Sequence, residues 1–160
     1  MPEVRLLMIS RDDLLEVATG QNGDQLFRAL GRLTRSGYQL LATAPQPEEW
    51  TKKHGGPDDA LLGPESLRKR LADAGGTLDG VYYVPRSLFT QKRNREKALR
   101  DIMKRYALKP AQCFMYSSSR SFVIVAQSLG ISATYLGEER ELLAELRTLI
   151  RNLPDQAGRA

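Results

Sequence analysis

The sequence predicts an α/β fold in which a central parallel sheet of five strands carries helices on both faces. Three observations indicate this fold. Five short apolar segments of strand length recur along the 160 residues. Segments with a helical spacing of apolar residues separate them, and glycine or proline follows most segments. Strands that alternate with helices form parallel sheets, because right-handed crossovers bring each strand back in the same direction.

The expected strands are apolar runs that stop at a polar residue or a turn. The first, residues 4–9, reads VRLLMI and stops at Ser10. The other four are expected at residues 39–43, 79–84, 112–116 and 131–136.

The expected helices repeat apolar residues every three or four positions. In residues 24–36, Leu26, Leu30 and Leu33 follow this spacing, and Gly37 is a typical residue just beyond a helix end. Further helices are expected at residues 64–74, 96–106, 121–129 and 138–152.

A single domain accounts for residues 1–153, a length that buries a substantial core. Residues 44–63 are rich in Pro, Gly, Lys and Asp and predict a long excursion or lid. Residues 86–95 predict a polar, basic loop, and residues 154–160 a flexible tail.

Composition excludes several kinds of site. One cysteine, Cys113, excludes an intramolecular disulfide and any zinc site with two thiolates, and one histidine, His54, excludes a His–His metal pair. The net charge of +5 is scattered along the chain, which is typical of a solvated surface. The sequence has neither a membrane-spanning stretch nor a signal-peptide pattern, so we expect a cytoplasmic protein without membrane contact.

Ligands of open α/β sheets bind at the carboxyl ends of the strands. The segments to inspect are therefore residues 10–13, 43–46, 85–95 and 117–121.

Three pieces of the chain carry a family resemblance. They are residues 67–85 (LRKRLADAGGTLDGVYYVP), the pair Gly37-Tyr38, and residues 126–131 (AQSLGI). In their order and spacing they resemble the haloacid dehalogenase (HAD) superfamily, and within it the histidinol-phosphate and heptose-bisphosphate phosphatases. The resemblance implies a Rossmann-like fold and magnesium-dependent transfer of a phosphoryl group to a carboxylate.

The first family motif is Asp-x-Asp-Gly, and the matching residues are Ser10, Arg11, Asp12 and Asp13. The resemblance places Ser10 at the nucleophile and Asp12 at the general acid/base. A serine hydroxyl without an adjacent base is a poor nucleophile, and it is also a weak magnesium ligand.

The second and third motifs bind the phosphoryl group. Thr43 matches the Thr or Ser that ends the second strand. For the basic residue of the third motif, Arg95 is the best match, with Arg93 next and Lys97 as a further candidate.

The fourth motif, Gly-Asp-x-x-x-Asp, supplies carboxylates to magnesium. It aligns with residues 117–122, where Ser118 and Phe122 replace both acids. The subfamily's zinc loop is also absent, since Val84 replaces its first cysteine. We therefore expect no catalytic residue, no magnesium site and no zinc site, with Ser10 and Asp12 as vestiges.

These losses predict a pseudo-phosphatase that binds a phosphorylated small molecule or a protein partner. The candidate binding residues are Ser10, Arg11, Asp12, Thr43, Arg93, Arg95, Ser117, Ser118 and Arg120. Simpler interpretations of these residues stay open. Asp12 could form an ion pair with Arg11 or Arg120, and the serines at residues 117–119 could cap a helix.

Two other functions remain as alternatives. One is a phosphatase or hydrolase with an atypical site, in which Asp12 and Asp13 hold the metal and water or Ser10 attacks. The other is nucleic-acid binding through the basic run at residues 92–97. Few aromatic residues interleave with that run, so we do not expect nucleic acid as the partner.

Overall fold

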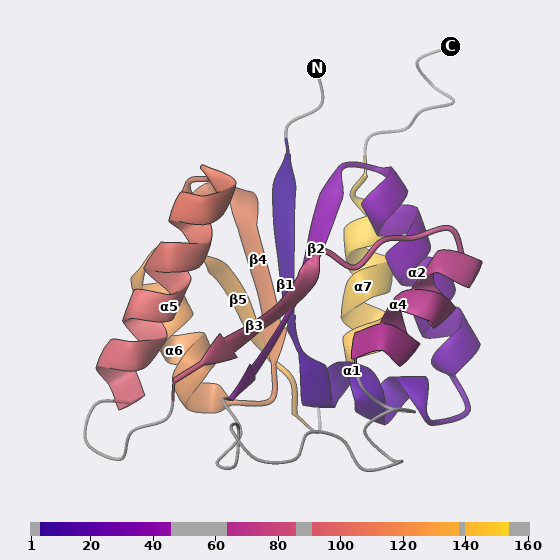
Figure 1. Cartoon of the computed structure of the whole chain (residues 1–160), viewed down its shortest axis with the longest axis horizontal. Coiled ribbons are helices and arrows are strands. Elements are labelled where there is room, and N and C mark those ends of the chain that lie inside the picture. The colour runs from indigo at the N-terminus through magenta and orange to yellow at the C-terminus, as the bar shows by residue number, and fades with distance from the viewer. Residues whose placement is uncertain (1–3, 46–63, 86–90, 138–139, 154–160) are drawn as a thin grey trace.

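The computed structural model describes residues 4–45, 64–85, 91–137 and 140–153. Its strands form one parallel sheet of five strands, as the sequence predicts, and the structure gives their order as β3-β2-β1-β4-β5 (Figure 1). The strands are β1 (Arg5–Ser10), β2 (Tyr38–Pro45), β3 (Gly80–Val84), β4 (Cys113–Ser117) and β5 (Ser132–Tyr135).

Helices cover both faces of this sheet (Figure 1). They are α1 (Arg11–Ala18), α2 (Gly23–Arg35), α4 (Pro64–Asp73), α5 (Gln91–Tyr106), α6 (Arg120–Ser128) and α7 (Leu142–Arg151). Helices α5 and α6 lie on one side, and α1, α2, α4 and α7 lie on the other.

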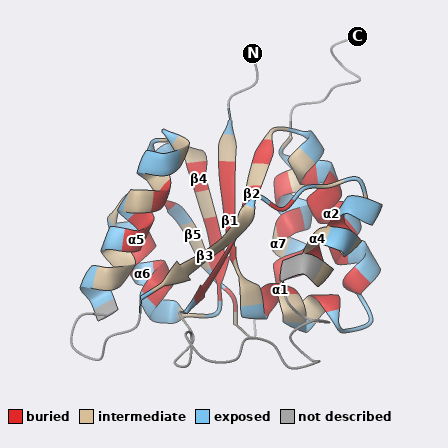
Figure 2. Cartoon of the chain, in the orientation of Figure 1, coloured by how far each residue is buried: buried red, intermediate tan, exposed pale blue. Residues whose placement is uncertain are grey.

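The side chains of β1 alternate between two hydrophobic cores (Figure 2). Leu7 and Ile9 belong to the core beneath α1, α2, α4 and α7, and Leu6 and Met8 belong to the core beneath α5 and α6. All four are 0% exposed, which explains why a central strand reads as an unbroken apolar run.

The order in which successive strands are added to the sheet reverses at β1. Strands β2 and β3 extend to one side of β1, and the chain then returns to place β4 on its other side. Ser10 ends β1 opposite Thr43 of β2, and Ser117 ends β4. Ligands of α/β sheets bind at such a reversal, so the fold brings these residues to the expected location.

Three expectations about helices are wrong in detail. Helix α1 follows β1 directly, where no helix was expected. Helix α5 begins at Gln91, so residues 91–95 are helical and do not form a loop. The closing helix begins at Leu142, four positions later than the apolar spacing indicates.

Helix α2 ends as the sequence predicts. Gly37 has a φ of 107°, a left-handed conformation that side chains rarely tolerate, and the chain turns there into β2. The predicted lid beyond Pro45 (residues 46–63, with Trp50 and His54) and the predicted tail (residues 154–160) lie outside the described residues. No described helix combines the length and the apolar character required to cross a membrane.

Candidate functional site

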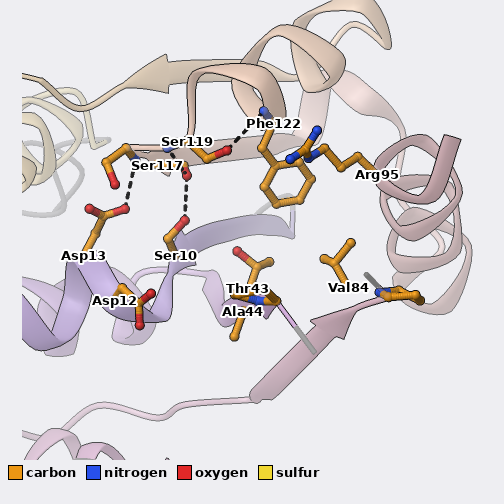
Figure 3. Close-up of a pocket in the computed structure, with 13 residues that line it drawn as sticks. Ser10, Asp12, Asp13, Thr43, Ala44, Val84, Arg95, Ser117, Ser119 and Phe122 are labelled. Carbon is orange, nitrogen blue, oxygen red and sulfur yellow. Dashed lines mark hydrogen bonds between the residues drawn. The ribbon is translucent and has the colours of Figure 1, made fainter. Parts of the chain in front are cut away.

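A cavity of about 290 Å³ lies at the carboxyl edge of the sheet (Figure 3). The ends of β1 to β4 and the first residues of α1 and α6 surround it, and α5 contributes one side chain. Its lining residues are Ser10, Asp12, Asp13, Thr43, Ala44, Pro45, Val84, Pro85, Arg95, Ser117, Ser118, Ser119 and Phe122.

Two serine hydroxyls join the central strands at the floor of this cavity. The Oγ atoms of Ser10 and Ser117 are 2.6 Å apart, a short hydrogen bond between the ends of β1 and β4. Ser117 is buried, and its Oγ also accepts a hydrogen bond of 3.0 Å from the backbone N–H of Ser119. Ser10 precedes α1 but forms no side-chain cap, so its hydroxyl serves the contact with Ser117.

Asp13 ties the first turn of α1 to the loop after β4. Its side chain is buried, and its Oδ2 accepts a hydrogen bond of 2.9 Å from the backbone N–H of Ser118 (Figure 3). A buried carboxylate needs such a partner, because burial without one is costly. The interaction positions the serine loop relative to β1.

Asp12 differs sharply from its neighbour. Its side chain is 74% exposed, and its Oδ1 lies 3.8 Å from Nη2 of Arg11. The pairing with Arg11 that the sequence left open is therefore present. Arg11 is not among the residues that line the cavity.

Helix α6 begins beside the same cavity with a serine cap. The Oγ of Ser119 accepts a hydrogen bond of 3.4 Å from the backbone N–H of Phe122. Helix capping is thus the role of Ser119, whereas Ser117 bonds across the sheet. The capping interpretation of the triple serine therefore holds for Ser119, and phosphate binding by the serine hydroxyls stays a prediction.

The arginines proposed as binding residues lie in different places. Arg95 lines the cavity from α5, as the third-motif match predicts (Figure 3). Arg93, two positions earlier, is exposed and is not a lining residue. Arg120 lies with its guanidinium carbon 4.8 Å from the ring centre of Tyr135 and lines a different depression, at the end of β5.

Six of the nine candidate residues therefore surround one cavity: Ser10, Asp12, Thr43, Arg95, Ser117 and Ser118. The other three, Arg11, Arg93 and Arg120, do not line it. Asp13 and Ser119 also line the cavity but are not among these nine residues, although Asp13 is a metal ligand in the alternative hydrolase. The available signal was their position directly after β1 and β4, within segments that the strand ends marked for inspection.

The donors around the cavity do not form a carboxylate cluster. Within residues 4–45, 64–85, 91–137 and 140–153, no three His, Cys, Asp or Glu side chains gather closely enough to hold a metal ion. Magnesium prefers carboxylate and other hard oxygen ligands. Of the two carboxylates here, one accepts a backbone N–H and the other pairs with an arginine.

The thiol of Cys113 lies within β4 and takes no part in this site. It is free and buried, and burial raises its pKa to about 11. A thiol with that pKa stays protonated at neutral pH and is a poor nucleophile.

Sequence comparisons give little. No family model matches the chain. The Fe–S cluster assembly protein dre2 of Talaromyces marneffei is 32% identical over 93 residues, which are 56% of this chain and 30% of that protein. The chain thus matches less than a third of the length of that relative, and the match assigns no function to it.

Structural comparisons are far more extensive. D,D-heptose 1,7-bisphosphate phosphatase from B. bronchiseptica, solved with magnesium and phosphate, covers 92% of this chain with a TM-score of 0.68 and 16% identity, over 99% of its own length. The corresponding enzyme from Burkholderia thailandensis covers 91% of this chain and 98% of its own, with a TM-score of 0.60 and 14% identity. An uncharacterized protein from Corynebacterium glutamicum covers 96% of this chain and 99% of its own, with a TM-score of 0.60 and 15% identity. The chain therefore has the same fold as these D,D-heptose 1,7-bisphosphate phosphatases.

Proposed function

We propose that this protein is a phosphatase homologue that binds a phosphorylated small molecule without hydrolysing it. One observation carries the proposal. At the end of β1, where the resemblance places the nucleophilic carboxylate, Ser10 presents a hydroxyl that is hydrogen-bonded to the hydroxyl of Ser117.

The surroundings of Ser10 do not activate it. A serine becomes a nucleophile when a base within hydrogen-bond reach removes its proton. The hydrogen-bond partner of Ser10 is another neutral hydroxyl. The Asp13 carboxylate is already engaged by a backbone N–H.

The donor set also fits magnesium poorly. Ser10, Ser118 and Phe122 stand where the phosphatase motifs place carboxylates. The remaining carboxylates, Asp12 and Asp13, have other partners. Without a divalent cation, the negative charge of a transferring phosphoryl group lacks its main stabilising partner.

The same cavity suits an anion in the absence of metal. Helices α1 and α6 both begin at its border, and helix N-termini carry a partial positive charge, while the N–H of Phe122 on α6 is already bonded to Ser119. Arg95 adds a cationic side chain, and Thr43 and Ser118 add hydroxyl groups. A volume of about 290 Å³ is at the small end of ligand sites, so we propose a small phosphorylated metabolite.

One observation favours a second candidate function. Asp12 lines the cavity with an exposed carboxylate, at the position that the family uses for general acid/base chemistry. An atypical phosphoric monoester hydrolase would use that carboxylate to activate water.

Isothermal titration with inorganic phosphate, and with a generic sugar phosphate, tests the first proposal. We expect binding in EDTA, with an affinity that changes less than about two-fold when magnesium replaces EDTA. A cavity that binds phosphate only in the presence of magnesium would overturn the proposal.

A further inference from the structure

Helix α5 carries a line of positive charge on the side opposite the core. It contains seven basic and two acidic residues, so its formal net charge of +5 equals that of the entire chain. Four of the basic residues, Arg93, Lys97, Arg100 and Lys104, are spaced by four, three and four positions.

This spacing places the four side chains on one ridge of the helix, which we call the α5 basic stripe. All four residues are exposed. The buried residues of α5, including Leu99 and Ile102, lie on the opposite side and pack into the core shared with α6. In Figure 2 exposed segments recur along α5 between intermediate and buried ones.

The stripe is not neutralised by the parts of the chain that the structure describes. There, no carboxylate lies at ion-pair distance from its four cationic groups. Asp101, on the same helix, is held by the hydroxyl of Tyr82 at 2.6 Å and by Nε of Arg105 at 3.1 Å, and the charge of Lys104 also acts on its carboxylate from beyond ion-pair distance. Like charges three and four positions apart repel one another on a helix. Glu96 and Asp101 lie at the same spacing from members of the stripe, so two negative charges on α5 stand against its four positive ones.

We infer that the α5 basic stripe binds the phosphate backbone of a nucleic acid. The stripe spans twelve residues, from Arg93 to Lys104, or about 16 Å from first to last. A duplex of that length carries about ten phosphates, so several are within reach of four cationic side chains. Lysine and arginine contacts to phosphates account for most sequence-independent binding of nucleic acids.

The chemistry of the stripe favours nucleic acid over two other anionic partners. Membrane-surface helices insert an apolar face between lipids, whereas the apolar face of α5 is buried in the core. Protein interfaces have an apolar centre, and among the described residues the exposed large hydrophobic side chains are Val4, Ile124 and Tyr135, none of them on α5.

The structure changes the arrangement expected for the basic run at residues 92–97. A loop over residues 86–95, as the sequence predicts, gives Arg93 no fixed position relative to the helix expected at residues 96–106. Because α5 begins at Gln91, Arg93 and Lys97 are one helical turn apart and extend the row formed by Arg100 and Lys104. The inference is independent of the cavity, since no member of the stripe lines it.

Fluorescence anisotropy with a labelled 16-base-pair DNA duplex tests the inference, at salt concentrations from 50 to 200 mM. We expect binding whose logarithm falls linearly with the logarithm of salt concentration. The double variant Lys97→Gln/Arg100→Gln should bind at least about ten-fold more weakly at 50 mM salt and reduce the salt slope by about 2.

The matched control is Arg28→Gln/Arg32→Gln, which removes two exposed charges from α2 on the other side of the sheet. This control should change the affinity less than about two-fold. Circular dichroism confirms that each variant is folded.

Three results would overturn the inference. One is the absence of duplex binding at 50 mM salt. Another is an equal loss of affinity in the α2 control, which would mean that net charge alone attracts the duplex. The third is tighter binding to phosphatidylserine vesicles or to polyglutamate than to the duplex.

Discussion

The hydroxyl of Ser10 is hydrogen-bonded to the hydroxyl of Ser117, and 107 positions of sequence separate the two residues. The contact joins the ends of the two central strands where the order of the sheet reverses. It occupies the floor of the cavity with neutral groups, at a position where the phosphatase resemblance implies charged ones.

This contact should be measurable as a coupling energy. We expect the changes in unfolding free energy of Ser10→Ala and Ser117→Ala to be non-additive by about 1 kcal/mol, the usual net value of such a hydrogen bond. Urea denaturation of the two single variants and the double variant gives the coupling. Ser36→Ala on the distant α2 cap, combined with Ser10→Ala, should be additive. Equal additivity in both pairs would contradict the role given to the contact.

Asp13 and Asp12 are neighbours with opposite environments, and they provide a matched pair. Asp13→Ala leaves the Ser118 N–H without its charged acceptor and should lower the free energy of unfolding by about 2 kcal/mol. Asp12→Ala removes an exposed charge and should change it by less than about 0.5 kcal/mol. Thermal or urea unfolding would contradict this account if both variants lost the same stability.

Arg95 and Arg93 form a second matched pair, on one helix. Arg95 lines the cavity and Arg93 does not. We expect Arg95→Gln to weaken the binding of inorganic phosphate about ten-fold, because a charge-assisted hydrogen bond is lost. Arg93→Gln should change it less than about two-fold. The same calorimetric titration measures both, and an equal effect would remove Arg95 from the proposed site.

Stability at alkaline pH should depend on Tyr82. Burial, together with the hydrogen bond to Asp101, raises the pKa of Tyr82 from its ordinary value of 10.0 to about 12. The folded state therefore favours the protonated hydroxyl. Its stabilising contribution is complete below pH 10 and is lost as the pH rises to about 12.

The variant Tyr82→Phe isolates this effect. The difference in unfolding free energy between the natural protein and the variant should shift against the natural protein as the pH rises from 10 to 12. Denaturant titrations at several pH values measure it. A difference that stays constant over this range would contradict the raised pKa.

The sheet could be predicted from the sequence because its strands are buried on both sides. Leu6 to Ile9 are fully buried, which requires an apolar run of strand length and little else. The starts of α1 and α5 could not be predicted in the same way. Their first turns, Arg11-Asp12-Asp13 and Gln91-Lys92-Arg93, are polar and show no apolar spacing.

Of the candidate site, the sequence could predict only the residues that lie at the ends of strands. Ser10, Thr43 and Ser117 follow from the rule that ligands bind at the carboxyl edge of a parallel sheet. The role of Asp13 depends on the backbone of Ser118, a contact between segments 105 positions apart that carries no sequence signal. Arg120 lies near the serines in sequence, yet its stacking on Tyr135 of β5 decides its position.

The most direct test of the central claim is phosphate release in the presence of magnesium. The panel contains phosphorylated sugars, nucleotides and a generic aryl phosphate, with Asp12→Ala and Ser10→Asp beside the natural protein. We expect no release by the natural protein, and none by Ser10→Asp, because one restored carboxylate does not rebuild the metal site. Magnesium-dependent release that disappears in Asp12→Ala would show a working phosphatase and contradict the account.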